Sequence, residues 1–202
     1  MSTWDRRSFL AGAGLLAAAF GLPSAAWALD GLPDAEAPTD RQRALLREVC
    51  QLVIPATDTL GAGDVGAGDF VILALAHGLG GTRAPVDADF APFRRSDGSV
   101  RHLAWLEATL DRQAGGDFAK APQRAQVLAT LDAAAFPPGP PPVAHSPWVA
   151  IKGLILTGYY TSEVGGEKEL VYAPVPGRWD PDLPLTPQTR AISNDWTAVD
   201  FG

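Results

Sequence analysis

The chain lacks the residues with which most proteins hold a metal ion or a redox group. Of its 202 residues, one is cysteine and three are histidine. One cysteine leaves no thiolates for an internal disulfide, an iron–sulfur cluster, a four-thiolate zinc site or a Cys-x-x-Cys-His haem attachment. His77, His102 and His145 are far apart in sequence, so a metal site could form only through long-range assembly. We therefore expect no metal and no cofactor in this chain.

Basic residues are also scarce. Lysine and arginine number 16 against 23 aspartates and glutamates, and the net charge is −7. A nucleic-acid partner is therefore not expected, because binding a phosphate backbone requires a basic face. The chain is 47% hydrophobic and long enough to bury the core of one globular domain. Its 18 prolines and 21 glycines indicate that a sizeable part is irregular.

No catalytic motif stands out. There is no Gly-x-Ser-x-Gly nucleophile elbow, and no pair of carboxylates can be singled out as acid and base. Cys50 follows Leu46 by one turn of an apolar helical stripe, which predicts burial as a small hydrophobic residue rather than catalysis. The sequence thus predicts no catalytic residue.

A glycine motif has the spacing of a nucleotide-binding loop but the wrong context. Gly61, Gly63 and Gly66 match Gly-x-Gly-x-x-Gly. A helix rather than a strand precedes them, and Asp64 and Asp69 would stand where a phosphate should approach. The motif therefore predicts a structural loop.

Residues 1–28 have the composition of an export signal. Arg6 and Arg7 precede an apolar run that begins at Phe9 and Leu10, and small residues before Ala28 predict cleavage after it. The paired arginines resemble the twin-arginine signal, which directs export of folded proteins, and an ordinary secretion signal is the alternative. Both predict a periplasmic protein. Since no later stretch is long and apolar enough to span a bilayer, membrane attachment is expected only through partners.

The periodicity of the remaining chain predicts a mainly α fold, a small bundle of about five helices. Thr39 and Gln42 form a capping-box pattern before the first helix, and Pro55 ends it. The predicted helices span residues 40–54, 70–79, Ser99 to Gly115, Pro122 to Pro137 and Pro147 to Tyr159. Residues 29–202 are expected to form this single domain.

From about residue 160 to 202 the sequence predicts a long, proline-rich, extended C-terminal tail. Prolines recur there from Pro174 to Pro187, which leaves no room for a long regular element. The tail is nevertheless more aromatic than disorder favours, since it includes Tyr172, Trp179 and Trp196. We expect it to lie on the chain's own domain or on another chain.

Three stretches carry a resemblance to a known family. They are Ile54-Pro55-Ala56-Thr57-Asp58-Thr59 with Gly61-Ala62, Lys152 to Glu163, and Tyr172-Ala173-Pro174-Val175-Pro176-Gly177 with Trp179. In this order, and after a twin-arginine signal, they resemble the gluconate 2-dehydrogenase subunit 3 family, the small subunits of periplasmic flavin-dependent sugar and polyol dehydrogenases. Leu60 departs from the proline usual in the family, which loosens one turn.

The resemblance implies a non-catalytic accessory subunit that carries no flavin. FAD and the catalytic residues would belong to a large subunit of the glucose-methanol-choline oxidoreductase type, and a haem c subunit at the inner membrane often completes such complexes. This chain would bind the large subunit, lend it the twin-arginine signal and remain bound as a stabilising partner. The residues expected to bind the partner are Tyr159, Tyr160, Ser162, Glu163, Tyr172, Pro176, Gly177 and Trp179.

Other interpretations of the sequence remain open. The aromatic residues could instead close this chain's own core. The chain could be a stand-alone periplasmic enzyme or ligand-binding domain, or an export chaperone that is released after translocation. The large subunit would determine the substrate, so gluconate, glucose, fructose, sorbitol and glycosides are all open.

Overall fold

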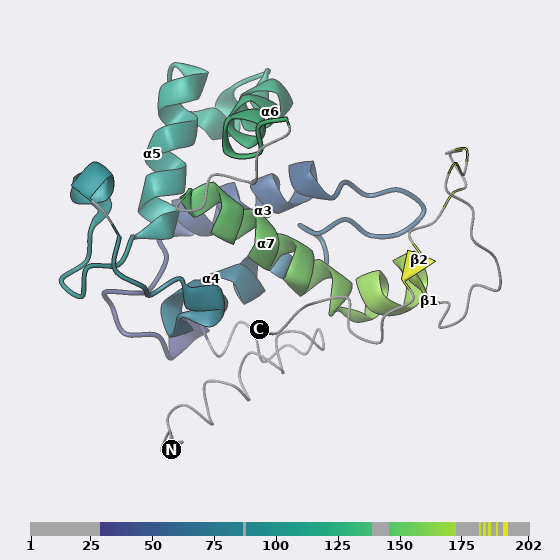
Figure 1. The fold of residues 1–202 in the computed structure, drawn as a ribbon, viewed down its shortest axis with the longest axis horizontal. Helices are drawn as coiled ribbons and strands as arrows, with labels where there is room; N and C mark the ends of the chain where they lie inside the picture. Colours follow the sequence, from purple (N-terminus) through teal and green to yellow (C-terminus); the bar gives the residue numbers. More distant parts are fainter. Residues whose placement is uncertain are drawn as a thin grey trace.

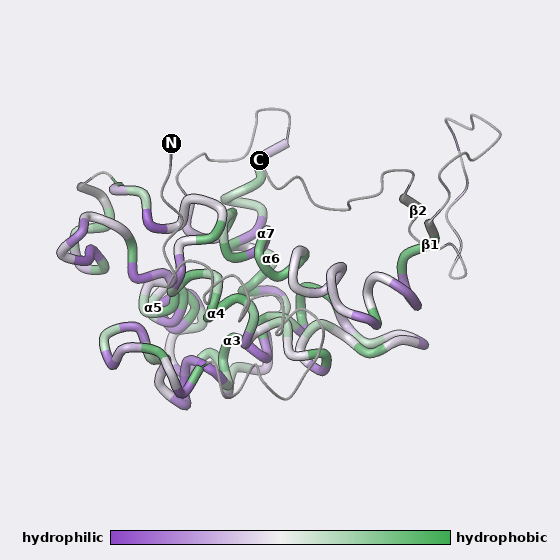
Figure 2. Tube along the Cα trace, turned by 90° about the horizontal axis from the view of Figure 1, so that it is seen from below, coloured by the Kyte–Doolittle hydropathy of each residue, from purple (hydrophilic) through white to green (hydrophobic). Residues whose placement is uncertain are grey.

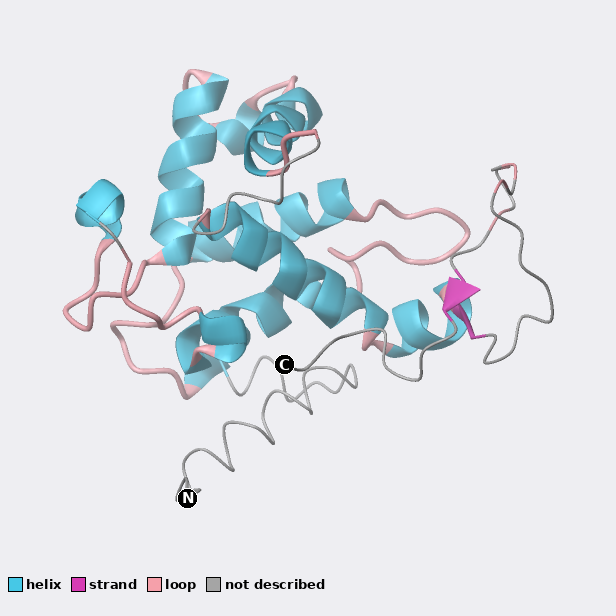
Figure 3. Ribbon diagram, in the orientation of Figure 1, coloured by secondary structure: helices cyan, strands magenta, loops and turns pink. Residues whose placement is uncertain are grey.

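The computed structural model describes residues 29–86, 88–138 and 146–172, together with residues 182, 184, 186, 189, 192 and 193. Five α-helices form the frame, so the mainly α fold predicted from the sequence is confirmed (Figures 1 and 3). They are α3 (Asp40–Val53), α4 (Ala67–His77), α5 (His102–Ala114), α6 (Arg124–Ala135) and α7 (Pro147–Tyr160). The shorter elements are η1 (Leu79–Gly81), η2 (Ala88–Phe93), η3 (Phe118–Lys120), the π-helix η4 (Val164–Glu169), and the strands β1 (Val171–Tyr172) and β2 (Ile192–Ser193), which pair in parallel.

Helix α3 begins and ends close to the residues that the sequence predicts. The Thr39 hydroxyl accepts a hydrogen bond from the Gln42 amide at 3.1 Å, and the Gln42 side chain accepts one from the Thr39 amide at 3.2 Å. This reciprocal pair satisfies two amides that a helix N-terminus leaves free. Ile54 is extended, as the residue before a proline prefers, and the helix ends at Val53.

Helix α5 starts later than its sequence predicts. The Ser99 hydroxyl donates to Asp97 Oδ1 at 2.6 Å instead of capping the helix, and Arg94 and Val100 form an antiparallel bridge. The chain is therefore still extended at Val100, and the helix begins only at His102. The prediction of a cap at Ser99 is wrong because the bridge, a tertiary contact, overrides the local signal.

The core forms where α7 crosses α3 and α4 (Figure 1). Hydrophobic residues gather where these helices meet, whereas hydrophilic residues occupy the outlying loops (Figure 2). Gly158 lets α7 approach α4 closely, because a Cβ atom there would lie 2.7 Å from the Phe70 ring. The largest fully buried side chains include Leu46, Val49, Ile72, Leu106, Leu110, Phe118, Trp148, Ile151, Ile155 and Tyr159.

The chain stays helical beyond the point where the sequence predicts an extended tail. Residues 164–169 form the π-helix η4 directly after α7. The Ser162 hydroxyl joins the two helices, since it donates to the Tyr159 carbonyl at 2.6 Å and accepts from the Gly165 amide at 3.1 Å. A Cβ atom at position 165 would collide with that carbonyl, so the turn requires glycine. The nearest proline, Pro174, lies beyond this segment and does not prevent it.

Among the helices in the described part of the chain, none has the length and apolar character that crossing a membrane requires.

Candidate functional site

Helix α7 has an unusual composition for a helix at the surface. Lys152 is its only charged residue among 14. One side faces the core with Trp148, Ile151, Leu154, Ile155 and Tyr159. The other side carries a stripe at helical spacing, which we call the α7 outer face: Val149, Lys152, Gly153, Leu156 and Tyr160, of which Val149 and Tyr160 are partly buried against the core. A helix that is exposed on one side normally places charged residues on that side. The α7 outer face has only one, which is unusual for a surface in contact with water.

The loop between α3 and α4 is fastened to the C-terminal end of α7. The Tyr159 hydroxyl donates a hydrogen bond to the Leu60 carbonyl at 3.1 Å. The Thr59 hydroxyl donates to Glu169 Oε2 of the π-helix at 2.6 Å. Residues 54–62, the end of α7, η4 and β1 therefore gather at one end of the molecule (Figure 1).

Three large hydrophobic side chains are exposed in the described part of the chain, and all three belong to these segments. Leu60 is 53% exposed, Leu156 is 38% exposed and Val171 is 43% exposed. We call this end, defined by these three residues and Tyr160, the apolar end. Clustered exposure of this kind marks an interaction surface more often than scattered hydrophobic residues do.

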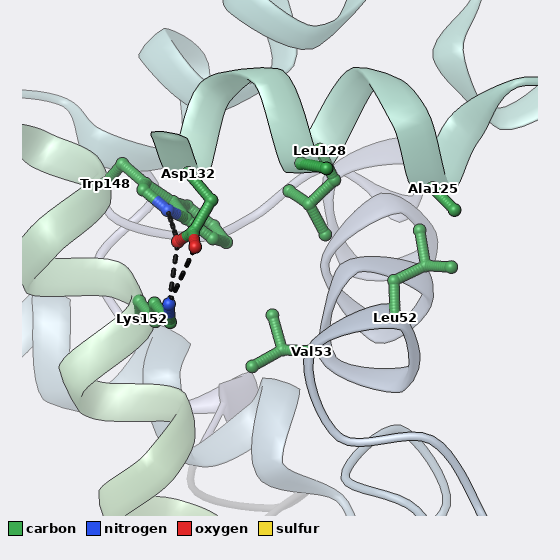
Figure 4. Close-up of a pocket in the computed structure, with 8 residues that line it drawn as sticks. Leu52, Val53, Ala125, Leu128, Asp132, Trp148 and Lys152 are labelled. Atoms are coloured by element: carbon green, nitrogen blue, oxygen red, sulfur yellow. Dashed lines mark hydrogen bonds and ion pairs between the residues drawn. The ribbon is translucent and has the colours of Figure 1, made fainter. Parts of the chain in front are cut away.

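A groove adjoins the α7 outer face, between α3, α6 and α7 (Figure 4). Its volume is about 190 Å³, and its lining residues are Leu52, Val53, Ala125, Leu128, Ala129, Asp132, Trp148 and Lys152. Asp132 Oδ1 accepts hydrogen bonds from Trp148 Nε1 and Lys152 Nζ, both at 2.7 Å, and Oδ2 accepts from Lys152 at 2.9 Å. The groove thus has apolar walls and one polar end.

The glycine loop is built for packing, as the sequence context predicts. A Cβ atom at Gly61 would lie 2.7 Å from the Ala56 amide nitrogen, and one at Gly63 would lie 2.7 Å from the Arg47 carbonyl oxygen. The Gly63 amide instead donates to the Gln51 side chain at 3.0 Å. The close approach to α3 accounts for these glycines without a phosphate ligand.

Two side chains that could in principle act as a base or a nucleophile, His102 and Cys50, are buried. His102 is buried with Nδ1 2.9 Å from the Val100 carbonyl oxygen, and burial lowers its pKa to about 4. Cys50 is fully buried, as its sequence pattern predicts, and burial raises the pKa of its thiol to about 12. Among the residues that the structure describes, no group of three or more His, Cys, Asp or Glu side chains could hold a metal ion.

Of the residues predicted to bind a partner, some are buried in the core, some lie at the surface and some lie outside the described residues. Tyr159 and Ser162 are buried and serve the chain's own fold. Tyr160 is half-buried with its ring edge-on to Tyr159, and Glu163 is exposed beside Lys168 at 3.2 Å. Tyr172 lies in β1. Pro176, Gly177 and Trp179, like the export-signal residues Arg6, Arg7, Phe9, Leu10 and Ala28, lie outside the described residues, so their roles stay predictions.

Sequence reasoning missed four residues that the structure brings to this surface: Leu60, Gly153, Leu156 and Val171. For Gly153 and Leu156, which lie in α7, a signal was present in the sequence. A helix of 14 residues with a single charge has too few polar side chains to face water on one side.

Comparison with known proteins identifies the family. The family model described as Gluconate 2-dehydrogenase subunit 3 matches residues 40–177. The chain therefore belongs to this family, and the resemblance found in its sequence is confirmed. The match includes α3, residues 54–62, α7 and η4, the elements that form the groove and the apolar end. No curated protein and no solved structure matches the chain.

Proposed function

We propose that this protein is the non-catalytic small subunit of a membrane-associated, periplasmic, FAD-dependent sugar or polyol dehydrogenase. It binds and stabilises a flavoprotein large subunit of the glucose-methanol-choline oxidoreductase type and carries the twin-arginine signal for both. FAD belongs to the large subunit, haem c to a third subunit at the inner membrane, and the large subunit determines the substrate. Membership of a family described as a dehydrogenase subunit supports this role.

The observation that carries the proposal is the outer face of α7, with its single charge, together with the apolar end. The cores of protein interfaces are depleted in charged residues, and beyond Lys152 the described residues of α7 carry no charge. Burial of apolar area stabilises a complex by about 25 cal/mol per Å² before the costs of association. If this chain binds the large subunit only in its folded state, it stabilises that state by about 2.7 kcal/mol when its free concentration is about a hundred times Kd.

Purification from the native host tests the proposal. The protein carries a C-terminal tag, is purified gently from periplasm and membranes, and is examined by visible absorption and a denaturing gel. We expect flavin absorbance and a larger chain in equal amount. A colourless single band would refute the proposal, and a flavoprotein complex confined to the cytoplasm would indicate a chaperone that is released on export.

Two sets of substitutions sharpen this test. Leu156→Asp places a charge on the α7 outer face and should remove most of the flavoprotein from the preparation, whereas Ala134→Asp at an exposed site on α6 should not.

Arg6→Lys with Arg7→Lys should leave both subunits in the cytoplasm, because the large subunit would depend on this signal. Export of the large subunit despite the double substitution would refute the shared signal.

A further inference from the structure

The groove between α3, α6 and α7 is lined by residues of two segments that lead on to the proposed interface. Lys152 lies at its polar end, and Leu156 and Tyr160 follow at one-turn spacing along α7 toward the apolar end. On the opposite wall, Val53 leads directly into residues 54–62, which carry the exposed Leu60. A partner that covers the apolar end and extends along α7 by two turns would therefore reach Lys152 and the groove.

From this arrangement we infer that the groove is a socket for one apolar side chain of the flavoprotein large subunit. The inference rests on the proposed function, because it names the contact through which the two subunits join. The inserted side chain is aliphatic or aromatic, and a hydrogen-bond donor of the same segment lies beside Asp132.

The size of the groove supports this occupant. An apolar protein cavity of about 150 Å³ accommodates benzene. The volume of about 190 Å³ here is therefore sufficient for the side chain of leucine or phenylalanine. Leu52, Val53 and Leu128 supply apolar walls (Figure 4). Ala125 and Ala129 also line the groove, and both are small and exposed, so they leave it open to solvent.

The polar end of the groove, at Asp132, has room for a hydrogen-bond donor of the partner. Asp132 Oδ1 already accepts two hydrogen bonds, from Trp148 and Lys152, whereas Oδ2 accepts one, from Lys152. A carboxylate oxygen can accept a second hydrogen bond, and it gains most from one when water is excluded. An N–H or O–H group beside the inserted side chain would donate a second hydrogen bond to Asp132 Oδ2 when the partner covers this carboxylate.

The size of a stable interface shows that the apolar end needs additional contact surface. Each partner in a stable complex contributes roughly 800 Å² of surface, far more than three partly exposed side chains can supply. Most of the binding energy of an interface comes from a few large side chains that fill pockets. The groove is an apolar pocket next to the apolar end and can receive such an anchor.

Filling the groove tests the inference in the native complex. Ala129→Trp places an indole at the mouth, and Ala125→Phe does so from the neighbouring turn of α6. The matched control is Ala134→Trp, because Ala134 is exposed on the same helix and does not line the groove. The tagged variants are produced in the native host, with the ratio of flavin to small subunit as the readout and the amount of small subunit as the measure of folding.

We expect both groove variants to lower the flavin ratio by about tenfold or more, the loss typical of a blocked anchor site, while the control keeps the wild-type ratio. If the Ala129→Trp small subunit does not fold and accumulate, the flavin ratio of the Ala125→Phe variant alone decides whether the groove is the socket. Wild-type flavin ratios in both groove variants, alongside a loss in Leu156→Asp, would overturn the socket and leave the proposed function intact. Absence of a flavoprotein from the wild-type preparation would overturn both.

Discussion

Substitution of Gly153 by alanine should stabilise the free chain. Gly153 lies inside α7, and a Cβ atom there would meet nothing within 4 Å. A glycine in a helix interior costs about 0.5–1 kcal/mol relative to alanine, because it loses more backbone freedom on folding. The fold itself therefore gains nothing from glycine at this position. For a domain of this size the gain corresponds to a rise in melting temperature of about 1–4 °C.

The same substitution should weaken the complex if the large subunit packs on the α7 outer face. Glycine in the middle of an exposed helix permits a close approach by another backbone, and a methyl group would hold the two surfaces apart. Overpacking a tight contact costs about 1–3 kcal/mol, which corresponds to a fivefold to hundredfold rise in Kd. Gly153→Ala should therefore raise the stability of the free chain and lower its affinity for the partner.

Differential scanning fluorimetry of the free chain and titration of the large subunit measure the two effects. Gly158→Ala is the control on the same helix, because its Cβ atom would lie 2.7 Å from the Phe70 ring and should lower the melting temperature. Gly153→Ala with unchanged affinity would refute a close approach at this position. A lower melting temperature of the free chain would refute the helix argument itself.

Three further predictions concern the stability and reactivity of the folded chain. Thr39→Ala removes the cap of α3 and should lower the free energy of unfolding by about 1 kcal/mol in urea titrations, whereas Thr39→Ser should not. Cys50, buried with its pKa raised to about 12, should not react with a thiol reagent until urea unfolds the chain, and rapid labelling of the native protein would contradict its burial. The pKa of His102 is lowered from 6.5 to about 4, so the folded chain takes up this proton at a lower pH than the unfolded chain does. The free energy of unfolding should therefore fall by up to about 3 kcal/mol as pH drops from 6.5 to 4. His102→Gln should flatten that part of the pH profile, and an unchanged slope would show that other groups cause it.

The sequence predicts best those elements whose signals are local. Helix α3 carries its capping box and its closing proline within its own segment, and the structure places it within one residue of the prediction. Helix α7 begins at Pro147 as predicted, because proline at the first turn has the backbone angle that a helix needs. In both cases a few neighbouring residues decide the boundary, so no distant contact can shift it far.

Elements that depend on distant contacts could not be predicted in this way. The start of α5 is set by the bridge between Arg94 and Val100, which no local pattern of Ser99 reveals. The π-helix requires Gly165 to pass against the Tyr159 carbonyl, a fit that appears only when both turns are in place.

One part of the candidate site could also be predicted from the sequence, and another part depends on the fold. That α7 carries a single charge can be counted in the sequence, but which side of the helix is buried depends on its packing against α3 and α4. The groove draws Val53, Leu128 and Lys152 from three separate helices, so its existence follows only from the fold.

Ion pairs among the described residues tie separate elements of this chain together. Arg41 binds Glu107 and also pairs with Asp111 at 2.7 Å and Asp117 at 3.2 Å, which ties α3 to the end of α5 and to η3. Exposed pairs of this kind contribute little stability individually, but they fix how the helices sit against one another. The large exposed hydrophobic side chains of the described residues are concentrated at the apolar end. A folded frame whose charged groups pair with one another, and whose large exposed hydrophobic side chains lie at one end, gains most from a protein partner at that end, because burial against another chain is what those side chains lack.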